Sequence, residues 1–206
     1  MKRKKKINNW LTKKNKEQFF KKSKIEGYRA RSAYKLLEIN KKFNFLKKGI
    51  CFLDLGSSPG GWSQVASKII MNGKLLGVDI KEMNKIDNVS FVKGDFNDPD
   101  IYKKIINYFN RKINVVVSDM AANTSGNKNL DSFRTGELCI NAMKLSLEIL
   151  ENDGVFVSKV FMGSIFNEIN EMAKKSFKKV VTFKPLSSKK ESREIYIYCK
   201  GISNYF

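Results

Sequence analysis

The sequence predicts an α/β protein with a mostly parallel sheet of seven strands, helices on both faces and an antiparallel last strand. Short apolar runs alternate with longer amphipathic stretches along most of the 206 residues, and this pattern is typical of strands joined by crossover helices. Only residues 184–193 separate the last two apolar runs, which is fewer than a parallel crossover needs. The final strand should therefore be antiparallel.

The individual elements follow from the same alternation. Strands are expected near residues 51–55, 74–79, 89–93, 114–118, 154–160, 178–183 and 194–200. Helices are expected near residues 31–40, 60–71, 100–110, 133–150 and 164–175. The length suits one well-cored domain, so we expect a basic N-terminal extension over residues 1–24 and a single domain over residues 25–206.

The first strand leads into a turn with Gly56, Gly60 and Gly61 that opens the next helix. These glycines would let the backbone approach a ligand, and the helix N-terminus offers unpaired N–H groups. The spacing is not the G-x-G-x-x-G of dinucleotide sites, and Asp54 would oppose a diphosphate but suit a cation. A cationic nucleoside such as S-adenosylmethionine therefore fits better than NAD, with an ordinary strand–helix turn as the competing interpretation.

Two further acids follow successive strands. Asp79 ends the second strand about 20 residues after the glycine turn, where an acid commonly accepts hydrogen bonds from ribose hydroxyls. Asp95 follows the third strand and could accept from an adenine amino group, with Phe96 against the ring. Each acid alone is more often a cap or turn residue, but their placement favours a nucleoside site. Trp62 could line that site or pack its helix onto the sheet.

A second group of residues should gather at the same edge of the sheet. Asp119 follows the fourth strand, Lys159 lies at the end of the fifth, and Glu194 begins the seventh. Because an antiparallel strand begins where parallel strands end, these side chains should share one cleft. Burial would favour a neutral Lys159 that accepts a proton, whereas the two acids would favour its ammonium. Either form could orient a hydroxyl, and a strand-end lysine that reaches water is the alternative.

The positive charge of the chain is concentrated at its N-terminus. The net charge is +20, and residues 1–48 hold 18 Lys and Arg against 3 Asp and Glu. This distribution favours a nucleic-acid partner over a membrane surface, because residues 1–6 lack the apolar face that a membrane-surface helix needs. Further along the chain, RNA contacts are expected from Arg29, Arg31, Lys189, Lys190 and Arg193. Solvated, exposed charges are the alternative.

The remaining composition excludes several classes of site. Cys51, Cys139 and Cys199 are odd in number and widely spaced in apolar runs, so they should be reduced core residues. The chain has no histidine, so neither a zinc site nor a histidine base is expected, and we predict no metal. No segment has the length of a membrane span or of a signal-peptide core. We therefore expect a soluble intracellular protein, as a monomer.

Five segments follow one another in a specific order: residues 54–64, Gly-Asp-Phe at 94–96, Val-Ser-Asp-Met-Ala at 117–121, Lys-Val-Phe at 159–161 and Ser-Arg-Glu-Ile-Tyr at 192–196. Together they resemble the FtsJ/RrmJ family of RNA ribose 2′-O-methyltransferases over about residues 10–200. The resemblance implies the Rossmann-like fold of S-adenosylmethionine-dependent methyltransferases. It also implies a catalytic tetrad of Lys35, Asp119, Lys159 and Glu194.

The resemblance further implies cofactor contacts from Gly60, Gly61, Trp62, Asp79, Asp95 and Asp119. Methyl transfer to a 2′-hydroxyl would use Lys159 as base or orienting group. Within the family, the Ser-Asp-Met-Ala sequence at residues 118–121 favours the large-subunit rRNA branch, where the target is a uridine, over the tRNA branch. Ala122 stands where the family usually has proline, and this departure should loosen a loop beside the site.

Three other functions remain open at this stage. The first is a tRNA ribose 2′-O-methyltransferase, and the second is a non-catalytic RNA-binding factor of ribosome assembly. The third is a nicotinamide dehydrogenase, which the glycine spacing disfavours. The partner is expected to be RNA, either large-subunit rRNA or a ribosomal particle, and not a membrane. Cytoplasmic, nucleolar and organellar locations, including mitochondria, all remain possible.

Overall fold

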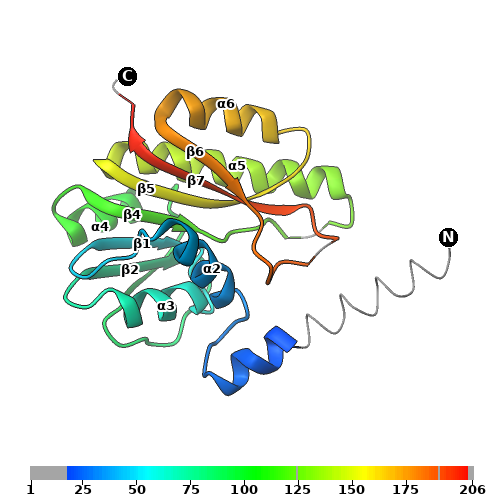
Figure 1. Ribbon diagram of the computed structural model, residues 1–206. Coiled ribbons are helices and arrows are strands. Elements are labelled where there is room, and N and C mark those ends of the chain that lie inside the picture. Colours follow the sequence, from blue (N-terminus) through cyan, green and yellow to red (C-terminus); the bar gives the residue numbers. More distant parts are fainter. Residues whose placement is uncertain (1–17, 124, 190, 204–206) are drawn as a thin grey trace.

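The computed structural model describes residues 18–123, 125–189 and 191–203. These residues contain a seven-stranded sheet with the order β3-β2-β1-β4-β5-β7-β6 (Figure 1). Neighbouring strands are parallel from β3 to β5, whereas β7 pairs antiparallel with both β5 and β6. The predicted fold class, including the antiparallel last strand, is confirmed.

The elements lie close to their predicted positions. The strands are β1 (Cys51–Leu55), β2 (Lys74–Asp79), β3 (Ser90–Lys93), β4 (Ile113–Ser118), β5 (Leu150–Phe161), β6 (Phe177–Phe183) and β7 (Glu194–Ile202). The helices are α2 (Ala33–Phe43), α3 (Gly61–Ile69), α4 (Pro99–Phe109), α5 (Lys128–Ile149) and α6 (Phe166–Ser176).

The start of α5 differs most from the prediction. The helix begins at Lys128, five residues earlier than expected, because the side chain of Asn127 caps it by accepting from the N–H groups of Asn129 and Leu130. Strand β5 also begins four residues early, at Leu150, which pairs with Ile113 of β4. Its exposed polar residues 151–153 have the composition of a loop, and this concealed the strand start.

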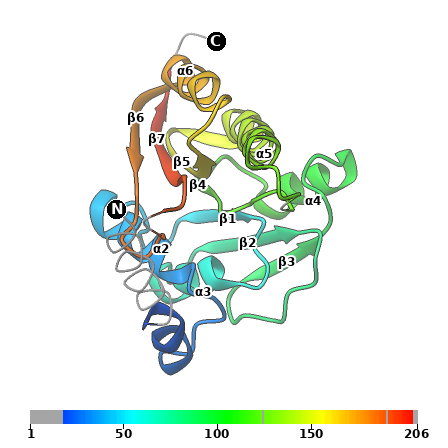
Figure 2. The same ribbon diagram turned by 90° about the vertical axis from the view of Figure 1, so that its right-hand side faces the viewer.

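Two layers of helices cover the sheet (Figure 2). Helices α4, α5 and α6 pack on one face over a core that includes Leu53 and Phe156. Helices α2 and α3 cover the other face, where Phe52 and Tyr196 are buried. The alternation of Phe52 and Leu53 between the two cores follows from the two-residue period of a strand. Cys51, Cys139 and Cys199 are buried and unpaired, as predicted.

A further helix over residues 18–25 precedes α2 (Figure 1). The Phe19 ring lies 5.3 Å from that of Tyr34 on α2, and Ser23 is only 3 % exposed. The predicted boundary between residues 24 and 25 therefore falls inside a helix that packs on the domain. Residues 1–17, the rest of the predicted extension, lie outside the described residues. Within the part of the chain that the structure covers, no helix combines the length and apolarity needed to cross a membrane.

Candidate active site

Four residues from different elements meet at the carboxyl end of the parallel strands. Lys35 comes from α2, Asp119 follows β4, Lys159 lies near the end of β5, and Glu194 begins β7. The Lys35 Nζ atom is 2.8 Å from Glu194 Oε1 and 3.8 Å from Asp119 Oδ1. The Lys159 Nζ atom is 3.1 Å from Asp119 Oδ1. The structure thus brings together all four residues that were predicted to be catalytic.

The Asp119 carboxylate is the centre of this cluster. Burial would raise the pKa of the Asp119 carboxyl, but the charges of Lys159 and Lys35, together with hydrogen bonds from Tyr196 and Lys159, lower it below its usual value. The Tyr196 hydroxyl donates to Asp119 Oδ1 at 2.6 Å. Lys159 also donates to the backbone carbonyl of Asp119. Asp119 is therefore ionised and fixed in place from three directions.

The charges of the cluster balance. Lys35 is 6 % exposed and Lys159 is 7 % exposed, so neither ammonium is well hydrated, and each needs a carboxylate beside it. Asp119 and Glu194 supply the two negative charges. The pKa of Tyr196 is raised well above its usual value, mainly by burial and to a smaller extent by the neighbouring carboxylates. The Tyr196 hydroxyl therefore remains a neutral donor.

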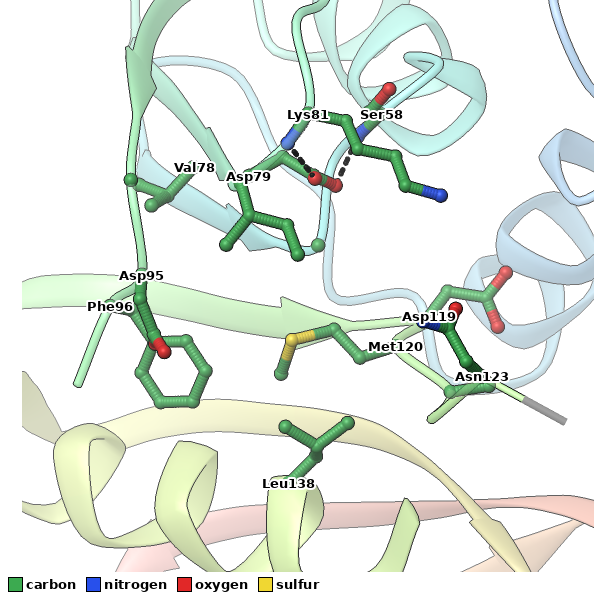
Figure 3. Close-up of a pocket in the computed structure, with 14 residues that line it drawn as sticks. Ser58, Val78, Asp79, Lys81, Asp95, Phe96, Asp119, Met120, Asn123 and Leu138 are labelled. Atoms are coloured by element: carbon green, nitrogen blue, oxygen red, sulfur yellow. Dashed lines mark hydrogen bonds between the residues drawn. The ribbon is translucent and has the colours of Figure 1, made fainter. Parts of the chain in front are cut away.

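A pocket of about 270 Å³ adjoins the cluster and shares Asp119 with it (Figure 3). Of the predicted cofactor residues, Gly56, Asp79, Asp95 and Asp119 line this pocket. Asp79 is held by the backbone N–H groups of Ser58, at 2.9 Å, and Lys81, at 2.7 Å. Each of its oxygens can still accept a second hydrogen bond.

Apolar side chains form the opposite wall of the pocket. Phe96, Met120 and Leu138 lie there, and Figure 3 shows Met120 and Leu138 next to each other. Gly56 has φ +74°, and a Cβ at this position would lie 2.1 Å from Met120 Cγ, so only glycine fits. Of these three apolar residues, the sequence singled out Phe96 alone. Acids that can accept from hydroxyl and amino groups, in one pocket with apolar side chains that can pack on a base, fit a nucleoside.

Three predicted cofactor residues are absent from this pocket. A Cβ on Gly60 would lie 2.7 Å from Ile86 Cδ1, and one on Gly61 would lie 2.9 Å from Ser32 Oγ. These glycines therefore allow other segments of the protein to approach α3. Trp62 donates through Nε1 to the Ser32 carbonyl at 2.9 Å and is 3 % exposed. Of the two roles considered for Trp62, the structure shows the packing role.

Asp54 also lies outside the pocket. Its side chain points to α3, where the Ser63 hydroxyl donates to Asp54 Oδ2 at 2.7 Å, and the residue is 1 % exposed. The expectation that this carboxylate faces a cationic ligand is not supported by its position. Burial raises the pKa of Asp54 to about 7, and the charges of Asp119 and Asp79 add to the effect, although the Ser63 hydrogen bond opposes it.

The raised pKa of Asp54 predicts a specific pH dependence of stability. In the unfolded chain this carboxyl ionises near pH 4, so from there upward the folded state binds the extra proton. Stability should therefore fall by about 2 kcal/mol between pH 5 and pH 7 through this group. Asp54→Asn should remove that part of the loss, as measured by urea unfolding at both pH values. An equal pH dependence in Asp54→Asn and wild type would contradict the assignment.

The five predicted RNA-contacting residues differ in their surroundings. The Arg29 guanidinium donates to the carbonyls of Asn84, at 2.5 Å, and Lys85, at 2.6 Å, so it holds a loop of the protein. Burial dominates the rise in the pKa of Tyr196, and the charge of Arg31 opposes that rise. Lys189 and Arg193 are exposed, and Arg193 directly precedes Glu194. Lys190 lies outside the described residues. RNA contact by these five residues stays a prediction.

The loop after β4 is anchored. The backbone N–H of Ala122 donates to Thr135 Oγ1 of α5 at 3.1 Å. Proline would lack this donor. The N–H that proline would remove thus attaches the loop to α5, and the expectation that Ala122 loosens the loop stays a prediction.

The sequence is similar to that of a known methyltransferase family and of several named proteins. Residues 28–202 match the family described as FtsJ-like methyltransferase. A protein of Pelagibacter ubique named ribosomal RNA large subunit methyltransferase E is 50 % identical over 93 % of this chain and 95 % of its own length. A protein of the same name from Rickettsia canadensis is 42 % identical, over 92 % of this chain and 86 % of its own.

Solved structures show the same fold. A crystal structure described as a ribosomal RNA methyltransferase of Plasmodium falciparum has a TM-score of 0.76 and 34 % identity, and the match covers 85 % of this chain and 98 % of that one. A methyltransferase structure from Streptococcus mutans in complex with SAH has a TM-score of 0.52 and 15 % identity, over 83 % of this chain and 95 % of that one. The second likeness extends to the fold alone.

Proposed function

Because this chain belongs to the FtsJ-like methyltransferase family, we propose that it methylates a ribose 2′-hydroxyl of large-subunit ribosomal RNA, at a uridine. The enzyme is an S-adenosylmethionine-dependent methyltransferase. The observation that carries the proposal is the charge-balanced cluster of Lys35, Asp119, Lys159 and Glu194. The cluster shares Asp119 with a pocket suited to a nucleoside.

The pocket residues have separable roles in this proposal. S-adenosylmethionine supplies, when bound, an electrophilic methyl group on a positively charged sulfur. Asp79 and Asp95 would accept hydrogen bonds from its hydroxyl and amino groups, and Phe96, Met120 and Leu138 would pack on its base. Asp119 would place a negative charge where the pocket meets the cluster.

The cluster would act on the ribose hydroxyl. Lys159 donates to two oxygens of Asp119 among the described residues, so the third position on its nitrogen is available to a substrate. There Lys159 would orient the hydroxyl or accept its proton. Lys35, which is held between Glu194 and Asp119, would fix the ribose from the other side. A hydroxyl held in this way needs little further ordering before it reacts.

Transfer of labelled methyl from S-adenosylmethionine tests the function. The substrates are large-subunit rRNA, free and in ribosomal particles, and total tRNA, with mapping of the labelled nucleotide. We expect label on a uridine 2′-oxygen of large-subunit rRNA. Label on tRNA would move the enzyme to the tRNA branch, and no label on any RNA would favour the non-catalytic assembly factor.

All four cluster residues come from one chain, so we also propose that the monomer is active.

The N-terminal charge should govern how RNA binding depends on salt. Residues 1–17 hold 8 Lys and Arg against 1 Glu. If several of these cations contact phosphates, raising salt from about 50 to 200 mM should weaken RNA binding by orders of magnitude, and deletion of residues 1–17 should flatten that dependence. The deletion leaves the helix over residues 18–25 in place. Equal slopes of log Kd against log salt for both proteins would refute an RNA contact by this segment.

A further inference from the structure

Helix α2 holds the loop between β6 and β7 through a single carboxylate. The backbone N–H groups of Leu186 and Ser187 donate to Glu38 Oε2 at 2.5 Å and to Glu38 Oε1 at 3.0 Å. The Leu186 side chain is 85 % exposed, so its own packing does little to hold this part of the loop. Glu38 is not among the residues that the sequence analysis singled out.

The same loop touches the catalytic cluster. The Ser188 hydroxyl, next to the residues held by Glu38, donates to Glu194 Oε1 at 2.8 Å. Lys35 Nζ lies 2.8 Å from that same oxygen. Lys35 and Glu38 are three residues apart on α2, so they lie one helical turn apart on one side of the helix. A closed ring therefore runs from Lys35 through Glu194, Ser188 and the loop backbone to Glu38 and back along α2.

We propose that Glu38 is a positioning residue for methyl transfer, acting through this ring. Glu38 accepts hydrogen bonds from the loop backbone and so fixes the position of Ser188. Ser188 in turn donates to Glu194 Oε1 and orients this oxygen toward Lys35. The role in catalysis rests on the proposed function, since the residues that it positions are those proposed to hold the ribose hydroxyl.

The ring is needed because Glu194 stands at the very start of β7, where the strand alone does not fix its side chain. Glu194 is the first residue of β7, so the ladder fixes its backbone from one side only. Both oxygens of Glu38 are used, one for each N–H, and hydrogen bonds to a charged acceptor are stronger than neutral ones. Loss of this carboxylate would leave the N–H groups of Leu186 and Ser187 without this acceptor, so Ser188 and with it Glu194 Oε1 would be less firmly placed.

The test compares Glu38→Ala with Glu38→Gln and Glu148→Ala. Glu148 serves as the control because it is exposed and accepts a hydrogen bond from Tyr102, not from the β6–β7 loop. Glu148→Ala therefore removes the same negative charge at a different place. We expect Glu38→Ala to slow single-turnover methyl transfer about ten- to a hundredfold with unchanged affinity for S-adenosylmethionine. Glu38→Gln keeps one acceptor and should restore part of the rate. Glu148→Ala should match wild type.

Two readouts do not depend on activity. In Glu38→Ala the amides of residues 186–189 should exchange with deuterium faster, and the buried Lys35 should react more readily with an acylating reagent. An unchanged loop exchange, a Glu38→Ala rate within about twofold of Glu148→Ala, or a parallel loss of cofactor affinity would each overturn the proposal. If the wild-type protein methylates none of the RNAs, the proposed function fails, and loop exchange and Lys35 acylation then decide whether Glu38 positions the cluster.

Discussion

Lys159→Ala is expected to lower the rate of methyl transfer about a thousandfold, within the 10²–10⁴ that proton transfer and its orientation commonly contribute. Lys159 donates to two oxygens of Asp119 among the described contacts, so one position on its nitrogen is left for a substrate. It does not line the pocket, so affinity for S-adenosylmethionine should stay within a few-fold of wild type. Single-turnover rates on the methylated RNA, together with a cofactor titration, measure the two effects separately.

An exposed lysine on the same sheet provides the control. Lys178 lies on β6 away from the cluster, and Lys178→Ala should retain wild-type activity. The pH profile adds information, because a wild-type rate that rises with pH and flattens reports the loss of a proton needed for reaction. A Lys159→Ala enzyme with more than about a tenth of the wild-type rate would remove Lys159 from the centre of the mechanism.

Asp119→Ala is expected to be the most destabilising change in the cluster. It would leave Lys35 with Glu194 alone and would remove the carboxylate that pairs with Lys159, and both lysines are buried. Removing one partner from a buried ion pair costs about 3–5 kcal/mol, which denaturant unfolding would measure. Activity should fall below that of Lys159→Ala, because Asp119 belongs to both the cluster and the pocket, and cofactor affinity should fall as well.

The pKa of Asp119 predicts how this loss varies with pH. Its folded pKa is lowered, so its stabilisation is fully present above the unfolded value near 4 and disappears as pH falls through the folded pKa. The stability difference between wild type and Asp119→Ala should therefore shrink in strong acid. Adding Lys159→Ala to Asp119→Ala should recover part of the stability, because one unpaired cation is removed. Strictly additive losses would argue against the charge pairing.

The acids that reach the pocket could be predicted because each stands at or beyond the end of its strand. Asp79 is the last residue of β2, and Asp95 and Asp119 follow β3 and β4. Asp54 is one residue inside β1 and shares a face with Phe52, so its side chain points to α3 instead of the edge. A shift of one position along a strand thus separates a pocket residue from a core residue.

Other features depended on contacts that no local pattern encodes. The glycines beside Trp62 have the composition of a ligand loop, yet Gly60 approaches Ile86 and Gly61 approaches Ser32, about 30 residues earlier in the chain. Glu38 contacts a loop 148 residues away, and in the sequence it is an ordinary polar residue of an amphipathic helix. Such pairings arise only once the sheet order brings α2 beside the β6–β7 loop.

The position of β7 has a consequence for synthesis of the protein. This strand follows β6 along the chain but lies between β5 and β6 in the sheet. A growing chain folds from its N-terminal part. One edge of β5 therefore stays without its final partner strand until the residues of β7, which follow β6, have left the ribosome. Glu194 arrives with that strand. A chain that ends before β7 therefore lacks Glu194 and has no complete cluster, so newly made enzyme becomes competent only after this last strand has been added to the sheet.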